Sequence, residues 1–380
     1  MDRVTKGCTR PCWTIRLSKH YRLRRHYRLW KHHRLHSGSL TSSLNSSLTH
    51  EENELALDQA TLAFLQAGAE AAGPDALPMW RMSPAEARTA AAAMNTAFGS
   101  GPAMGSTEEH TLTGWDGGTF RIRVHVPLPA PHSVFIYLHG GGWVLGDLEG
   151  YDTLARQLAD KSGAAVVLVE YRKAPEHPFP AAVEDAWTAL QWAAAHATRL
   201  AGADAPLFVG GDSAGGNLAA VMALRSRERG GPALARQFLI YPVTDADFSR
   251  ASYAEPQNQT LLTAELMQWF WDHYLPDAQH RTAPEASPLR AADLAGLAPA
   301  FVVTAEHDVL RDEGEDYAER LRRAGNEVEF HRWPGQMHGF FSRVNLLPAS
   351  AEVMDLVAGA VHDDVADALD ARFAVLRVDA

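Results

Sequence analysis

Ser213 stands in a sequence context that is typical of a catalytic nucleophile. Residues 207–209 (LFV) predict a short buried strand, GGDSAGG follows at 210–216, and a helical pattern comes next. Ser213 is thus the centre of a G-x-S-x-G pattern at a strand-to-helix turn, where glycines permit a strained backbone and the helix dipole favours developing negative charge. A glycine-rich turn capped by serine is the structural alternative. Because strand, turn and helix come in the required order, we predict that Ser213 is the nucleophile.

Consecutive glycines upstream supply candidate backbone donors. The predicted strand 134–138 leads into His139 and then into three glycines. We expect the N–H groups of Gly141 and Gly142, together with that of Ala214, to surround the oxyanion of a tetrahedral intermediate. A flexible loop is the alternative, but its place at a strand end favours the oxyanion site. His139 is expected to brace the loop, because it precedes the serine, whereas a catalytic histidine follows the serine in this arrangement.

The catalytic acid is expected after a later strand. Residues 301–304 (FVVT) predict that strand, and four acidic residues follow it: Glu306, Asp308, Asp312 and Glu313. Asp308 lies in the loop beyond the strand. The last two have the positions of first-turn residues of the next helix, where a helix dipole favours acids. We therefore predict Asp308 as the acid, with helix capping as its alternative role.

The catalytic base is expected after the next predicted strand, at 328–333. His338 follows in a glycine-flanked loop, PGQMHGFF, which suits a positioned imidazole. His331 lies within that strand and His307 lies beside the acid, so both are expected to pack or to face solvent. The order of serine, acid and histidine along the chain is the expected one. In the implied mechanism His338 accepts the serine proton, and water then hydrolyses an acyl-enzyme.

Strands and helices alternate along the body of the chain. This alternation predicts an α/β fold with a mostly parallel sheet covered by helices on both faces, and with its site beyond the carboxyl ends of the strands. The expected strands are 120–126, 134–138, 165–171, 207–209, 238–241, 301–304 and 328–333, and the expected helices are 57–67, 84–98, 152–161, 180–196, 214–229, 313–324 and 350–373.

The first 54 residues differ from the rest of the 380-residue chain. Residues 1–50 carry eleven Lys or Arg and one acid, in short tandem repeats such as RLSKHY, RLRRHY and RLWKHH, although the net charge of the chain is −11. We predict a disordered basic tail over 1–54. It is interpreted as a non-functional extension, with an arm for nucleic acid or anionic membrane and a targeting peptide as alternatives. The acidic body disfavours nucleic acid as a partner.

Composition limits the remaining classes of function. Hydrophobic residues make up 46% of the chain, yet no run approaches the roughly 18 apolar residues of a membrane span. Cys8 and Cys12 are the only cysteines, so we expect neither a disulfide framework nor a thiolate metal site, and we expect a cytoplasmic protein. A metal hydrolase is disfavoured because the body contains no HExxH motif or comparable ligand cluster.

Several motifs in order resemble the hormone-sensitive lipase family of bacterial esterases, also called family IV. They are HGGGWVLGD (139–147), EYRKAPEHPFPAAVEDA (170–186), GGDSAGGNLAA (210–220), LIYPVTD (239–245), AEHDVLRDEG (305–314) and MHGFF (337–341). The resemblance covers roughly residues 56–375. It implies the α/β-hydrolase fold, short- to medium-chain acyl esters as substrates and no cofactor or metal. The acid before the nucleophile, Asp212, also belongs to the family's serine motif.

The resemblance further implies a helical cap over the site. N-terminal helices within 55–105 and an insertion around 250–288 would form it, beside a catalytic domain that spans 106–380. Aromatic side chains there and near the glycine loop are candidates for substrate contacts, namely Trp80, Trp143 and Trp269. Ordinary packing is the alternative role for these tryptophans.

Other functions remain open at this stage. A lactone, amide or carbamate hydrolase would use the same machinery, and some relatives of this fold bind ligands without catalysis. The presence of His338 favours an enzyme over such a binding module. The expected partners are a small-molecule ester and, as one option for assembly, a second copy of the chain in a homodimer.

Overall fold

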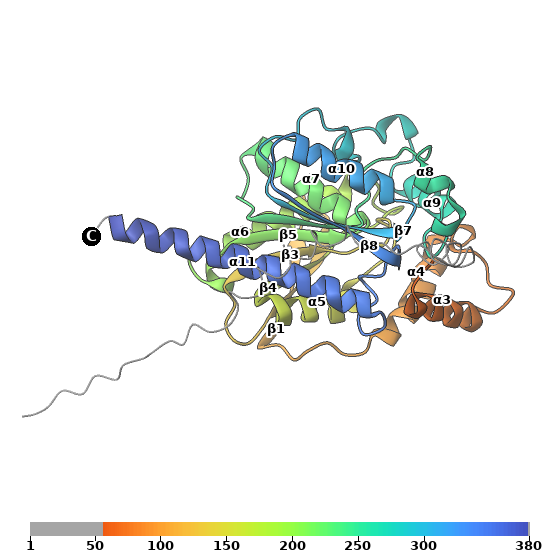
Figure 1. Ribbon diagram of the computed structural model, residues 1–380, viewed down its shortest axis with the longest axis horizontal. Coiled ribbons are helices and arrows are strands. Elements are labelled where there is room, and N and C mark those ends of the chain that lie inside the picture. The colour runs from red at the N-terminus through yellow and green to blue at the C-terminus, as the bar shows by residue number, and fades with distance from the viewer. Residues whose placement is uncertain (1–55, 379–380) are drawn as a thin grey trace, which may run out of the picture. The chain divides into compact units, whose positions relative to one another are not determined.

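The structure is a computed structural model, and it describes residues 56–378. These residues form one β-sheet with helices around it. Within these residues eight strands lie in the order β1-β2-β4-β3-β5-β6-β7-β8 (Figure 1). β2 pairs antiparallel with β1 and β4, and all other neighbours are parallel. The strands are β1 (Ser106–Thr113), β2 (Thr119–Val126), β3 (Ser133–Leu138), β4 (Ala164–Glu170), β5 (Leu207–Asp212), β6 (Arg236–Ile240), β7 (Ala300–His307) and β8 (Val328–Met337).

Side chains of the central strands alternate between two apolar clusters. On β3, Val134, Ile136 and Leu138 pack into one cluster, whereas Phe135 and Tyr137 pack into the other. This alternation follows from the two-residue period of a strand. Every residue of β3 and β5 is buried, as expected for parallel strands covered on both faces.

Helices cover the two faces of the sheet. Side chains of α6, α7 and α10 belong to the first cluster and those of α5 and α11 to the second, and Figure 1 shows α5 and α11 crossing the face opposite α7 and α10. α5 begins four residues before the predicted helix, because Asp147 caps it by accepting the N–H of Gly150 at 2.7 Å. The bounds are α5 (Leu148–Ser162), α6 (Ala181–Ala201), α7 (Ala214–Arg229), α10 (Arg311–Arg323) and α11 (Pro348–Val378).

The other helical segments lie before β1 and between β6 and β7. Figure 1 shows α3, α4, α8 and α9 gathered at one end of the sheet. These segments are α3 (Gln59–Ala72), η2 (Met79–Arg81), α4 (Pro84–Asn95), η3 (Thr96–Phe98), α8 (Ala251–Ala254), η4 (Pro256–Asn258), α9 (Ala264–Tyr274), η5 (Ala278–His280) and η6 (Pro288–Arg290), where η marks a 3₁₀ turn. The prediction of a disordered tail over 1–54 concerns residues outside the described part.

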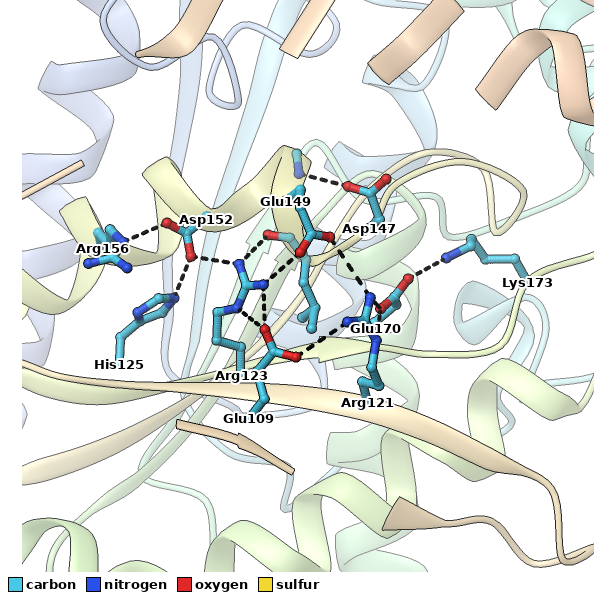
Figure 2. Close-up of polar contacts among 12 residues, drawn as sticks. Glu109, Arg121, Arg123, His125, Asp147, Glu149, Asp152, Arg156, Glu170 and Lys173 are labelled. Carbon is cyan, nitrogen blue, oxygen red and sulfur yellow. Dashed lines mark hydrogen bonds and ion pairs between the residues drawn. The ribbon is translucent and has the colours of Figure 1, made fainter. Parts of the chain in front are cut away.

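An ion-pair network joins the edge of the sheet to α5, as Figure 2 shows. Arg123 on β2 lies 2.6 Å from Glu109 of β1, 2.7 Å from Glu149 and 2.8 Å from Asp152 of α5. Arg121 on the same strand lies 2.7 Å from a β4 carboxylate, Glu170. α5 begins six residues after the last of the three consecutive glycines, Gly142, so these ion pairs connect the helix that follows the glycine loop to the sheet.

Candidate active site

Three predicted residues meet at the carboxyl end of the sheet. The Nε2 atom of His338 lies 2.9 Å from Ser213 Oγ, and its Nδ1 atom lies 2.7 Å from Asp308 Oδ2. Each residue directly follows a strand, β5, β8 or β7, and all three are buried. Parallel strands end at the same edge, so residues 125 and 30 positions apart in sequence come into hydrogen-bonding contact.

Ser213 has a backbone conformation that is rare for a residue with a side chain. Its φ is 56° and its ψ is −119°, at the turn between β5 and α7. A Cβ atom at Gly211 would lie 2.2 Å from the carbonyl oxygen of Leu138, and one at Gly215 would lie 1.9 Å from the same atom. Only glycine fits at these two positions, and the serine hydroxyl is thereby held at the start of α7.

The glycine loop faces the same space as the serine. Gly141 and Gly142 line the cavity that contains Ser213, and both have positive φ, 114° and 58°. A Cβ atom at Gly142 would lie 2.1 Å from the ring of Phe270. Glycine is therefore required at this position both by the positive φ and by the lack of space for a side chain. Ala214, the third predicted donor, is the first residue of α7 and is fully buried.

Asp212 connects the glycine loop to the nucleophile turn. Its carboxylate accepts hydrogen bonds from the N–H of Gly140 at 3.0 Å, the hydroxyl of Tyr137 at 2.8 Å and that of Tyr151 at 3.1 Å. Burial raises the pKa of Asp212, while these donors oppose that shift. In the sequence Asp212 stands out only as part of a motif, because its three donors come from other segments of the chain.

His139 packs beneath the same loop, where sequence analysis expected it. Its ring stacks on Tyr171 with 4.2 Å between centroids, and Nδ1 lies 2.8 Å from the carbonyl oxygen of Gly140. Burial lowers the pKa of His139 to about 3, so the imidazole stays neutral in ordinary buffers. A neutral ring with a fixed partner suits a bracing role.

Of the four candidate acids, one contacts the histidine. Glu306 accepts the N–H of Gly335 at 2.7 Å, and Asp312 accepts that of Ser252 at 2.8 Å. Asp308 accepts the N–H of Leu310 at 2.9 Å with Oδ1, which leaves Oδ2 for His338. Asp308 therefore caps a turn and holds the imidazole with separate oxygens.

Glu313 lies in the first turn of α10, as predicted, but its carboxyl serves a different element. It is fully buried and accepts the N–H groups of Thr244 and Asp245, at 2.8 and 3.3 Å. Burial raises the pKa of Glu313 to about 8, although both backbone donors favour the charged form. The loop after β6 is thus attached to α10 by a carboxyl that holds a proton at neutral pH.

This raised pKa predicts a pH-dependent stability. The pKa of a glutamate is 4.5 when unperturbed and about 8 here, so the stabilising contribution of protonated Glu313 is complete below pH 4.5 and is lost as pH rises to about 8. Glu313→Gln stays neutral at every pH. As pH rises across this window, the unmodified protein should lose free energy of unfolding relative to Glu313→Gln. The difference should grow by up to about 1.4 kcal/mol per pH unit.

Urea unfolding at a series of pH values measures that difference. Glu319→Gln on the same helix is the control, because the Glu319 carboxyl is solvent-exposed and hydrogen bonds from Arg322 and Arg323 lower its pKa. The control is expected to show a constant difference over the same window. A constant difference for Glu313→Gln as well would contradict the protonated state.

A cavity of about 150 Å³ opens onto Ser213 and His338. Its walls are mostly apolar, and the side chains come from four parts of the chain. Among the lining residues are Met79, Ala91, Met94 and Phe98 from the N-terminal segments, Leu145 and Tyr151 beside the glycine loop, Leu261, Leu262, Leu266 and Phe270 between β6 and β7, and Ser342 and Arg343 after β8. Such a space suits a small ester with an apolar part.

None of the three tryptophans predicted to contact substrate belongs to this lining. Trp143 is fully buried, and its ring stacks on Tyr274 with 4.0 Å between centroids. Trp80 packs against the core, and Trp269 packs against His273 of its own helix. The neighbour of Trp269 in α9, Phe270, faces the cavity instead.

Neither a metal site nor a membrane span is found among the described residues. Residues 56–378 contain no group of three or more His, Cys, Asp or Glu side chains that could hold a metal ion. In the same range no helix combines the length and apolarity that a membrane crossing requires.

Comparison with known proteins places the chain in a family. Residues 135–342 match a family described as having the alpha/beta hydrolase fold. The chain is similar to the carboxylesterase NlhH of Mycobacterium tuberculosis, with 44% identity over 251 residues that cover 64% of this chain and 78% of that protein. It is also similar to an ethyl acetate hydrolase of Pseudomonas putida, with 38% identity over 260 residues that cover 66% of this chain and 81% of that protein.

Solved structures agree with these relatives. The crystal structure of a thermostable esterase from Pseudomonas putida ECU1011 matches with a TM-score of 0.76 and 39% identity, over 82% of this chain and 98% of that one. The chain therefore belongs to the α/β-hydrolase family. The predicted fold, the resemblance to bacterial esterases and the predicted class of enzyme, a carboxylic ester hydrolase, are confirmed.

Proposed function

We propose that this enzyme hydrolyses carboxylic esters with short to medium acyl groups, and that Ser213, His338 and Asp308 form its catalytic triad. The observation that carries the proposal is the pair of contacts made by His338, 2.9 Å to Ser213 Oγ and 2.7 Å to Asp308 Oδ2. An imidazole held between a hydroxyl and a buried carboxylate can accept the hydroxyl proton as the oxygen attacks a carbonyl.

The mechanism has two halves. In the first, Ser213 Oγ bonds to the ester carbonyl carbon, its proton moves to His338 Nε2, and the tetrahedral intermediate expels the alcohol, which takes that proton. In the second, His338 accepts a proton from water, the hydroxide attacks the acyl-enzyme, and the carboxylic acid leaves as Ser213 regains its proton. Asp308 keeps the imidazole in the tautomer whose Nε2 can accept.

The oxyanion in both halves is assigned to backbone donors. The N–H groups of Gly141, Gly142 and Ala214 are proposed to receive it, and the loss of one such donor typically raises the barrier by about 3 to 4 kcal/mol. Support comes from the positive φ of both glycines and from the Asp212 bridge to Gly140, which fix the loop beside the serine. Asp212 is thus proposed as a positioning residue.

The acyl pocket is proposed to lie under a cap built from the N-terminal segments within 55–105 and the insertion around 250–288. The cavity lining supports this, because Met94 and Phe98 come from the first segment and Leu261 and Phe270 from the second. The remainder, 106–380, would be the catalytic domain that carries the insertion.

The first of these cap segments is also attached to the histidine loop. The N–H of Asp58 donates to the carbonyl oxygen of Gly335 at 2.9 Å, and the buried hydroxyl of Thr61 donates to Gln336 Oε1 at 3.0 Å. Gln336 precedes His338 by two residues, so α3 supports the base as well as the cap.

A series of p-nitrophenyl esters tests the proposed function. We expect kcat/KM to be highest for acetate, butyrate or hexanoate and to fall steeply by palmitate, because a cavity of about 150 Å³ cannot enclose a long chain. An anilide and a lactone of matched acyl length serve as controls for amidase and lactonase activity. A preference for palmitate would contradict the proposed pocket, and turnover of the anilide alone would contradict the ester assignment.

Two other predictions stay predictions. The homodimer is measurable by light scattering of the purified chain. The cytoplasmic location, which rests on the position of Cys8 and Cys12 and on the lack of cysteine elsewhere, is measurable by fractionation of the source cells.

A further inference from the structure

One charged side chain in the active-site cavity has no role in the proposed mechanism. Asp212, His338 and Arg343 all line the cavity. The first is held by two tyrosine hydroxyls and a backbone N–H, and the second lies between the serine and the acid. Arg343 remains to be explained.

Arg343 lacks the partners that a guanidinium normally takes. Its Nη1 atom makes one long hydrogen bond, 3.5 Å to Ser342 Oγ, and its Nε atom is buried with no acceptor among residues 56–378. The rings of Phe64 and Phe98 flank the group, with 5.8 and 5.6 Å between the guanidinium carbon and the ring centroids. Within the described residues no carboxylate forms an ion pair with it.

Several other arginines of the chain do have carboxylate partners. Five that are mostly buried each form ion pairs with at least two carboxylates, namely Arg123, Arg172, Arg225, Arg236 and Arg311. A buried cation without a counter-charge is costly, so it is normally paired. Arg343 is half-buried, its Nε atom is fully buried, and it has no such counter-charge among residues 56–378, although it lines the active-site cavity.

The position of Arg343 suits contact with a bound substrate. It belongs to the same loop as His338, and its Nη2 atom lies 3.9 Å from where a Cβ atom at Gly339 would stand. Phe98 and Leu261 also line the cavity, so the surroundings of the guanidinium are partly apolar. In such surroundings a guanidinium attracts an anion strongly and can bind a carboxylate with two parallel hydrogen bonds.

We propose that the natural substrate is an ester that also carries a carboxylate, and that Arg343 binds this carboxylate. The inference rests on the proposed function and narrows its substrate class. The carboxylate can belong to the acyl part, as in a monoester of a dicarboxylic acid, or to the alcohol part, as in the acetyl ester of a hydroxy acid. The chemistry of recognition is the same in both.

Two pairs of small esters test this specificity and separate the two sources. Methyl hydrogen succinate is compared with methyl butyrate for the acyl side, and acetoxyacetate with propyl acetate for the alcohol side, all by pH-stat titration at neutral pH. The variants are Arg343→Gln and Arg343→Lys. Arg322→Gln is the control, because Arg322 is an exposed residue of α10 that pairs with Glu319.

We expect the unmodified enzyme to prefer the anionic ester of one pair. Arg343→Gln should lower kcat/KM for that ester by about 10- to 100-fold, the range for one hydrogen-bonded charge, while the neutral ester changes little. Arg343→Lys should restore part of the preference, because it restores the charge but not the planar fork. Added salt should weaken the preference, and Arg322→Gln should leave it unchanged.

Different results overturn different claims. If the unmodified enzyme hydrolyses both neutral esters and turns over neither anionic ester better, the carboxylate proposal is wrong while the esterase proposal stands. If Arg343→Gln lowers kcat/KM for neutral and anionic esters equally, the role of Arg343 is to support Phe64 and Phe98. If no ester is hydrolysed, the proposed function itself is wrong.

Discussion

Ser213→Ala is expected to lower kcat for p-nitrophenyl butyrate by about 10⁵- to 10⁶-fold, because removing the nucleophile removes the covalent path altogether. His338 and Asp308 cannot compensate, since the mechanism assigns them only proton transfer and orientation. Residual hydrolysis would come from the backbone donors and from binding alone. The fold should survive, because alanine is smaller than serine. The positive φ of 56° strains the backbone equally with either residue, since both have a Cβ atom.

The control for this substitution is a second buried serine. Ser162→Ala removes a hydroxyl that donates to the carbonyl oxygen of Leu158 at the end of α5, away from the cavity. We expect that variant to lose about 1 kcal/mol of stability and to keep its activity. A fluorophosphonate should label the unmodified enzyme at Ser213 and should not label Ser213→Ala. Turnover by Ser213→Ala within tenfold of the unmodified enzyme would refute the nucleophile assignment.

The contacts among the three predicted residues follow from the topology that the sequence encodes. Each candidate catalytic residue follows a predicted strand. Two of these strands, β5 and β7, are apolar and almost wholly buried, whereas β8 is buried only at its last two residues, directly before His338. The carboxyl ends of parallel strands share one edge, so the order of motifs is enough to bring Ser213, Asp308 and His338 together. No side-chain packing had to be known in advance.

Features that depend on packing were missed. β1 (Ser106–Thr113) was not predicted because it is an edge strand with six exposed residues, where Leu112 alone is buried and no alternating apolar pattern appears. The three tryptophans do not line the cavity, and sequence alone does not fix this because the direction of a ring depends on its packing, as with Trp143 against Tyr274 and Trp269 against His273. For Arg343 the sequence offers one indication, which is that it is the only charged residue in the mostly apolar segment 339–348 after His338.

The identity of the acid is the assignment that most needs mutation, since the four candidate carboxylates lie in the last residues of β7 or shortly after it. Asp308→Asn is expected to lower kcat by about 10⁴-fold. The reason lies in the two partners of the carboxylate. Leu310 N–H requires an acceptor at Oδ1, so the amide oxygen will take that place and the amide nitrogen will face His338 Nδ1. An N–H in that position forces the proton of the imidazole onto Nε2, which can then no longer accept the serine proton.

Glu306→Gln and Asp312→Asn are the matched controls, because their carboxylates accept backbone N–H groups of Gly335 and Ser252 that an amide oxygen can still satisfy. Both variants should stay within a few-fold of the unmodified enzyme in kcat, with similar melting temperatures. A loss of only a few-fold in Asp308→Asn, together with a large loss in either control, would move the role of the acid to that neighbour. A large loss in Asp308→Asn alone would show that activity requires the tautomer of His338 with its proton on Nδ1, which Asp308 holds in place.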